Sequence, residues 1–164
     1  MKDRNWLWWL VSAVAVGLLF VTGLAFAQAT VTPYTALESF VAVVDYGELT
    51  QPGGNWHLRG YTIDLTRNGS DPRVNGGTLR MVVNFNHDED FSGPAWGSAR
   101  WVIGDGLWEG TFEGNTNHVA QTGYYDAVWH GSGEFDGLQL KETCVYTGGY
   151  PGTCAGRILQ APSD

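Results

Sequence analysis

The sequence predicts an all-β protein, built as a single closed or nearly closed antiparallel β-barrel of about eight strands. A two-sheet sandwich is the alternative. Apolar and polar residues alternate in many short stretches, and glycine-rich turns separate these stretches. Beyond residue 27 the chain does not sustain the spacing of an amphipathic helix. Closure into a barrel is favoured because an open, glycine-rich sheet would leave edges prone to aggregation.

The alternation is clearest between residues 95 and 140. Trp108 and Phe112 share one predicted face, and Glu109 and Glu113 share the other. The turn Gly104-Asp105-Gly106 before them is typical of a hairpin, because glycine takes the positive φ that tight turns need.

Glycines recur inside these strands, where they normally weaken a sheet. They indicate bulges, sharp bends, or aromatic rings lying over bare backbone, and Trp129 and Phe135 are the candidate covering rings.

The other elements follow from the same pattern. Residues 28–35 form an extended lead-in, since Pro33 disfavours a helix. Residues 67–77 are polar and rich in turn residues, so we expect a loop there. A hairpin through the cysteines closes the chain, after strands at residues 37–46, 56–66, 79–87, 97–103, 107–113, 118–130 and 132–142.

The apolar run from Trp6 to Ala27 predicts a signal peptide over residues 1–27, which leaves a β-barrel domain at 28–164. The run would form an apolar helix and ends in Ala25-Phe26-Ala27, a tripeptide suited to signal peptidase. We therefore expect a secreted or periplasmic protein that leaves the membrane after cleavage. An uncleaved membrane anchor is the competing interpretation, because the run is long enough to span a bilayer.

The net negative charge of the chain disfavours some classes of binding partner. Without Lys2, Asp3 and Arg4 the chain has seven basic and sixteen acidic residues, a formal charge of −9. Nucleic acid and anionic lipid are poor partners for such a chain, because both carry negative charge.

Two cysteines, Cys144 and Cys154, flank a turn rich in glycine. An even number of cysteines in an exported chain predicts a disulfide, here across a hairpin. We expect neither a metal site nor a cofactor. The four histidines are scattered and the sequence has no HExxH motif, while the acidic loop at residues 88–90 is more simply a solvated loop than a calcium site.

Signals for catalysis are weak, so no catalytic residue is assigned and a non-enzymatic role is favoured. No nucleophile elbow is present. Glu109 would be a proton-transfer candidate if it faced a closed interior, but a surface position is favoured. Arginines within strands, Arg59, Arg80 and Arg100, are expected to pair with strand carboxylates such as Asp64, Glu109 or Glu134, with an acidic ligand as the alternative.

The segments GNWHLRG, DPRVNGG, GPAWGSARW, GLWEGTFEG and WHGSGEFDGLQL together resemble exported bacterial proteins of uncharacterised function. Their pattern is also similar to the allene oxide cyclase and dirigent barrels of the calycin-like group. The resemblance covers most of residues 36–160 and implies a β-barrel with a central cavity. It implies no reaction, because fold is a poor guide to activity.

Three functions remain open on the sequence. The first is an exported barrel that binds a small, largely apolar ligand in an aromatic-lined cavity. The second is a cyclase or isomerase that uses the same cavity, and the third is a structural or interaction module with a packed interior. The candidate ligand-binding residues are Trp101, Trp108, Trp129, Arg80 and His130.

Overall fold

The computed structural model describes residues 29–161, which are almost entirely β-sheet. The all-β prediction is confirmed, whereas the predicted signal peptide at 1–27 lies outside the described residues. The elements are β1 (Thr30–Asp45), β2 (Glu48–Thr50), η1 (Pro52–Gly54), β3 (Trp56–Gly69), η2 (Pro72–Val74), β4 (Thr78–His87), β5 (Ser92–Ile103), β6 (Gly106–Asn117), β7 (Thr122–Gly133), β8 (Leu138–Thr147) and β9 (Gly152–Gln160).

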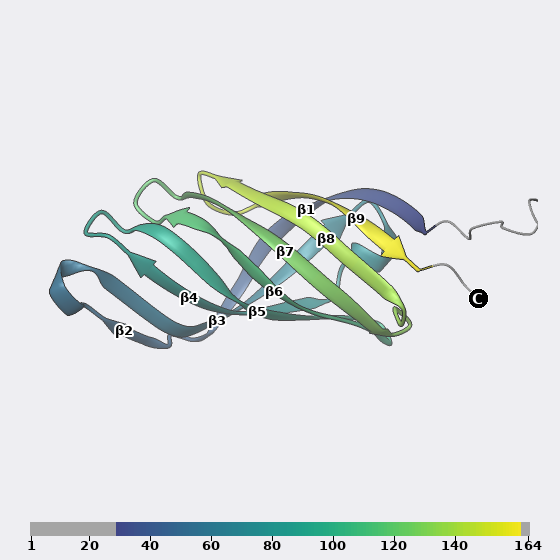
Figure 1. The fold of residues 1–164 in the computed structure, drawn as a ribbon, viewed down its shortest axis with the longest axis horizontal. Helices are drawn as coiled ribbons and strands as arrows, with labels where there is room; N and C mark the ends of the chain where they lie inside the picture. Colours follow the sequence, from purple (N-terminus) through teal and green to yellow (C-terminus); the bar gives the residue numbers. More distant parts are fainter. Residues whose placement is uncertain (1–28, 162–164) are drawn as a thin grey trace, which may run out of the picture. The chain divides into compact units, whose positions relative to one another are not determined.

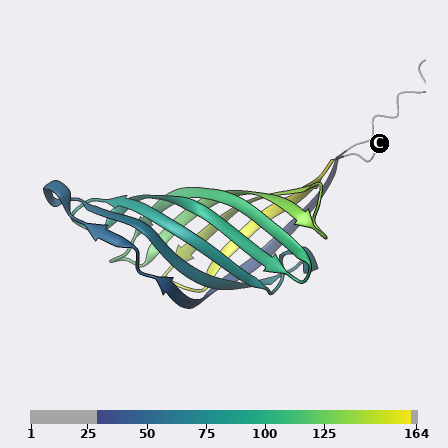
Figure 2. The same ribbon diagram turned by 90° about the horizontal axis from the view of Figure 1, so that it is seen from below.

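All nine strands belong to one antiparallel sheet, and eight of them form a closed ring (Figure 1). From β3 to β9 each strand pairs with the next along the chain, and β1 closes the ring by pairing with both β9 and β3. The short β2 lies outside the ring and pairs with the beginning of β3, the part of β3 that does not pair with β1. Figure 2 shows the strands crossing the ring obliquely.

The ring is uneven where β1 closes it. β1 pairs with β9 over residues 30–38 and with β3 over residues 36–45, so the two pairings overlap only briefly. Beyond Glu38, β1 pairs with β3 alone among the described strands. Before Ala36, β1 pairs with β9 alone, so only residues 36–38 of β1 are paired on both sides and the ring is open beside β1 at each end.

Several predicted boundaries were wrong. β1 begins at Thr30, β5 begins at Ser92 and β6 continues to Asn117, so these strands are longer than predicted. β3 continues to Gly69 because its last residues pair with β1, so Arg67 lies in a strand and not in a loop. The strands expected at 118–130 and 132–142 begin later, at Thr122 and Leu138, since turns occupy the residues before them.

A bulge in β3 interrupts the alternation of that strand. Leu58 and Ile63 are both buried although they are five positions apart, which would place them on opposite faces of a regular strand. The pairing with β4 shifts between Leu58 and Tyr61, where Gly60 takes a φ of 74°. Glycine tolerates this backbone and the extra residue brings both apolar side chains inward.

The ring interior is densely packed at the end that holds Thr30 and Gln160. Trp101 and Trp108 are fully buried, and their indole N–H groups donate to backbone carbonyls of Gly76 and Arg73 in the β3–β4 connection. Val74 of η2 is also fully buried in this connection. Other large side chains with almost no exposure complete this end, namely Leu65, Leu79, Trp129, Leu140 and Ile158.

Two interior glycines lie against aromatic rings, as predicted. A Cβ on Gly106 would come within 2.4 Å of the Phe135 ring, and one on Gly110 within 3.1 Å of the Trp129 ring. The absent side chains therefore make room for the rings. Within residues 29–161, no helix has the length and apolar character needed to cross a membrane.

Candidate functional site

A cavity with a mostly apolar wall lies at the end of the ring away from Thr30 and Gln160. Its volume is about 520 Å³. The β4–β5, β6–β7 and β8–β9 connections contribute Phe91, His118 and Tyr150 to its wall, and β2 contributes Leu49. This is the end marked by β2 in Figure 1.

The cavity wall is mostly apolar. Aliphatic side chains such as Ile63, Met81 and Val83 come from β3 and β4. Aromatic rings from six strands and two connections form most of the rest, namely Phe40, Tyr61, Phe85, Phe91, Phe112, Tyr124, Tyr125, Tyr146 and Tyr150. A volume between about 300 and 1,000 Å³ with such a wall is typical of small-molecule sites.

Few polar groups reach the cavity, and among the described lining residues there is no lysine, arginine, aspartate or glutamate. Besides tyrosine hydroxyls, the polar lining groups are Thr116 and His118. Burial lowers the pKa of His118, so its ring is neutral near pH 7. The wall itself therefore carries no formal charge near neutral pH.

A second histidine, His87, lies behind this wall. Its ring stacks on Phe85 with a centroid distance of 3.9 Å, and its Nε2 lies 2.9 Å from the Thr116 hydroxyl. Its Nδ1 is buried without a hydrogen-bond partner. Desolvation, together with nearby His118, lowers the pKa of His87 to about 4.

A buried ionic cluster separates the cavity from the packed end. Arg67 of β3 lies between Glu38 of β1 and Glu142 of β8, and all three side chains are fully buried. The Arg67 Nε donates to the Glu38 carboxylate at 2.7 Å. Its two Nη atoms each donate to Glu142 at 2.8 Å, which makes that contact bidentate.

Tyrosine and tryptophan side chains supply the other donors. The Tyr125 hydroxyl donates to Glu38 at 2.9 Å, and the Tyr146 hydroxyl also donates to Glu38. The Tyr34 hydroxyl and the Trp129 indole donate to Glu142 at 2.5 and 2.8 Å. Every partner of the two carboxylates is thus a donor, an arrangement that suits their ionised form.

Aromatic faces also contact the guanidinium. The Arg67 Cζ lies 4.7 Å from the Trp101 ring centroid and 5.7 Å from that of Trp129. Burial alone would lower the pKa of Arg67, but Glu142 and Glu38 hold that pKa well above its usual value. Arg67 therefore stays charged.

Tyr125 and Tyr146 connect the cluster to the cavity, because both line it and both donate to Glu38. Burial raises the pKa of each phenol well above 10, and the charge of Glu38 raises both further. Both phenols are therefore neutral at any physiological pH.

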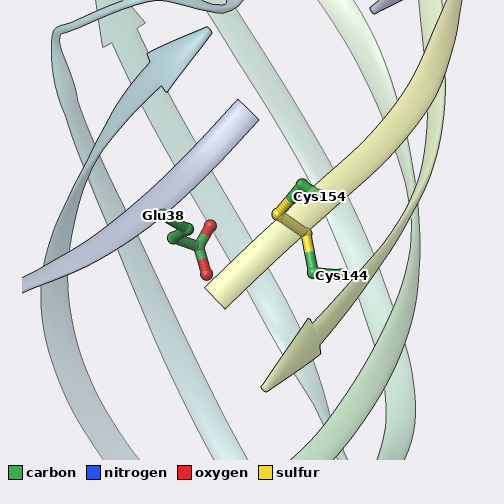
Figure 3. Close-up of side chains that lie close together, drawn as sticks. All are labelled: Glu38, Cys144 and Cys154. Atoms are coloured by element: carbon green, nitrogen blue, oxygen red, sulfur yellow. A yellow bond between two sulfur atoms is a disulfide. The ribbon is translucent and has the colours of Figure 1, made fainter. Parts of the chain in front are cut away.

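The predicted disulfide between Cys144 and Cys154 is present and fully buried beside the cluster. Figure 3 shows the Glu38 carboxylate directed toward it. One ligand atom from each of these three residues lies within 4.8 Å of the others. Because the sulfurs are bonded to each other, the thiolates that a metal would need are absent.

The residues predicted to bind a ligand lie elsewhere. Trp101, Trp108 and Trp129 occupy the packed end and the ionic cluster and are not among the cavity-lining residues. Arg80 is on the outer face, where it donates to Asp64 at 2.8 Å, and His130 is exposed.

Two of the expected arginine–carboxylate pairs form. Arg80 pairs with Asp64, and Arg100 approaches Glu109 to 3.5 Å on the surface. Glu109 thus takes the surface position that the sequence favours. Arg59 instead donates to the backbone carbonyls of Leu58 and Phe85.

Sequence reasoning missed Glu38, Arg67 and Glu142. The signal was available, since each continues an alternating inward pattern such as Leu138, Leu140, Glu142 and Cys144. A charged residue at an inward position normally suggests a strand end, so the pattern alone does not reveal a buried ionic cluster.

Comparison of the chain with protein-family models, curated proteins and solved structures gives no match. The functional argument therefore rests on the geometry of the cavity and the cluster.

Proposed function

We propose that the protein is an extracytoplasmic β-barrel of calycin-like type that binds a small, largely apolar molecule in the cavity at the open end of its ring. The observation that carries this proposal is the 520 Å³ cavity with its aromatic wall. Apolar walls with a few polar groups are the usual form of small-molecule sites. Location outside the cytoplasm is supported by the buried disulfide, since such bonds persist in oxidising compartments.

Binding is favoured over both alternatives. An open cavity of this size with a mostly apolar wall is unexpected for a purely structural module, because exposed apolar surface usually marks an interaction or ligand site. A cyclase or isomerase needs an acid or base that faces the ligand, and apart from hydroxyl groups the described cavity wall offers only the neutral His118 ring, with no carboxylate among the lining residues. Glu38 and Glu142 are not cavity-lining residues, and their oxygens already accept hydrogen bonds from Arg67 and neighbouring tyrosines.

The proposal is tested with Nile red, a neutral dye whose fluorescence rises in apolar sites. Val83→Trp places a large ring on the cavity wall and should abolish saturable binding. Val128→Trp adds the same ring to the exposed face of β7 and should leave binding unchanged. Equal dye binding by both variants would contradict the proposal.

Native mass spectrometry of protein purified from its own host gives an independent measurement. A retained small molecule that is lost in Val83→Trp identifies the natural ligand. If the wild-type protein has the mass of the polypeptide alone and also fails to bind Nile red, the cavity is not a binding site.

A further inference from the structure

We propose that the cavity selects uncharged apolar molecules whose polar group donates a hydrogen bond, such as long-chain alcohols, and rejects the corresponding carboxylates. This inference rests on the ligand-binding function proposed above and assigns that site a ligand class. It follows from the charge of the buried cluster and from the direction of the hydrogen bonds between the cluster and the cavity wall.

The charge behind the wall is negative. Glu38 and Glu142 contribute two carboxylates and Arg67 one guanidinium, which leaves a formal charge of −1 in a fully buried cluster. Buried charges are weakly screened, so their field reaches the cavity more strongly than that of surface charges. A ligand carboxylate next to Tyr125 and Tyr146 would meet this field.

No lining group compensates for that field. The described cavity wall has no lysine or arginine, and His118 is neutral. The nearby Arg59 is engaged outside the wall by Phe85 O and by the Asn86 side chain.

The segments beside the mouth add further negative charge. They carry exposed acidic side chains, at Asp45 and Glu48 near β2 and at residues 88–90 after β4. A carboxylate would therefore lose its hydration without gaining a cation, which is strongly unfavourable.

Hydrogen-bond direction selects among uncharged ligands. The hydroxyl protons of Tyr125 and Tyr146 are both used on Glu38. The Tyr125 oxygen also accepts a hydrogen bond from Arg67 Nη2 at 2.8 Å. Next to the cluster, the Tyr146 oxygen therefore offers a lone pair and no proton, so it suits a ligand that donates. The other lining tyrosine hydroxyls, of Tyr61, Tyr124 and Tyr150, can donate to or accept from a ligand, and an alcohol satisfies both kinds of group.

The test compares dodecanol, dodecyl methyl ether and dodecanoate on the wild-type protein at pH 7 by isothermal titration calorimetry. One additional hydrogen bond predicts that dodecanol binds about tenfold more tightly than the ether. Dodecanoate should bind at least about tenfold more weakly than dodecanol, since no cation compensates its charge.

Tyr146→Phe removes the acceptor and keeps the ring. Dodecanol affinity should then fall to that of the ether, while ether affinity stays unchanged. Tyr46→Phe is the matched control, because Tyr46 is exposed and is not among the cavity-lining residues. It should preserve the tenfold preference for the alcohol.

The outcomes separate the two proposals. Dodecanoate binding as tightly as dodecanol, or an alcohol preference that survives Tyr146→Phe, overturns the ligand class while leaving the binding function intact. Failure of all three compounds and of Nile red to bind overturns the binding function itself. If Tyr146→Phe does not fold, the three-compound comparison on the wild-type protein still decides the ligand class.

Discussion

Replacing Arg67 with methionine should be among the most damaging substitutions in the described chain. Methionine fills a similar volume but leaves Glu38 and Glu142, both fully buried, without the cation that lies between them. Removing one partner of a buried ion pair costs about 3–5 kcal/mol, and here a single guanidinium serves two carboxylates. Because domains are stabilised by only about 5–15 kcal/mol, the variant should be at the limit of folding at pH 7.

The assay is urea-induced unfolding followed by tryptophan fluorescence, which reports directly on Trp101 and Trp129 beside the guanidinium. Arg80→Met is the matched control, since Arg80 also makes a bidentate contact with a strand carboxylate but on the outer face. Its effect should be small, because exposed ion pairs contribute little. An Arg67→Met midpoint equal to that of Arg80→Met would refute the argument that Arg67 stabilises the two buried carboxylates.

The remaining predictions concern the disulfide, the buried histidine and one glycine. Cys144→Ala/Cys154→Ala should lower the free energy of unfolding by about 2–3 kcal/mol, as expected for a short disulfide-closed loop; alkylation of the denatured, unreduced wild-type protein should label no thiol, and a labelled thiol would contradict the bond. In the unfolded protein His87 binds a proton near pH 6.5, whereas in the folded protein it does so only near pH 4. The free energy of unfolding should therefore fall as the pH is lowered through this interval. His87→Leu should reduce that slope while His130→Gln, on the exposed face, keeps it, and identical slopes in the two variants would count against His87 as the source. Gly106→Ala should cost about 1–3 kcal/mol in chemical denaturation because its methyl group meets the Phe135 ring, and an unchanged midpoint would show that the ring moves freely.

Much of the fold could be predicted from local patterns. Leu79, Met81 and Phe85 of the predicted strand at residues 79–87 alternate inward, because period-two patterning records which face of a strand meets the core. Closure of the ring could be inferred because an open sheet would leave unpaired edges. The disulfide could be inferred from two cysteines that flank a turn. The missed features depend on long-range contacts. Arg67 is held in a strand by β1, about thirty residues earlier in the chain, and turn-forming neighbours concealed that pairing.

The candidate site was less predictable for a related reason. Tryptophans dominate the interior pattern, yet Trp101, Trp108 and Trp129 fill the closed end while tyrosines and phenylalanines line the cavity. The segments at the two ends of a ring decide which end stays open. Here η2 places Val74 in the interior at one end, whereas at the other end the pairing of β1 with β9 stops at Glu38. Alternation gives the face of a residue, but not its depth along the axis.

The double pairing of β1 has a consequence for biosynthesis. Thr30 pairs with Gln160, so the first strand of the described chain cannot obtain its second neighbour until the last strand has been synthesised. Contacts so distant in sequence form slowly, and in the meantime the backbone groups of β1 and β8 that face β9 remain available to other chains. Nascent or truncated forms that lack β9 should therefore depend on chaperones to avoid pairing with one another.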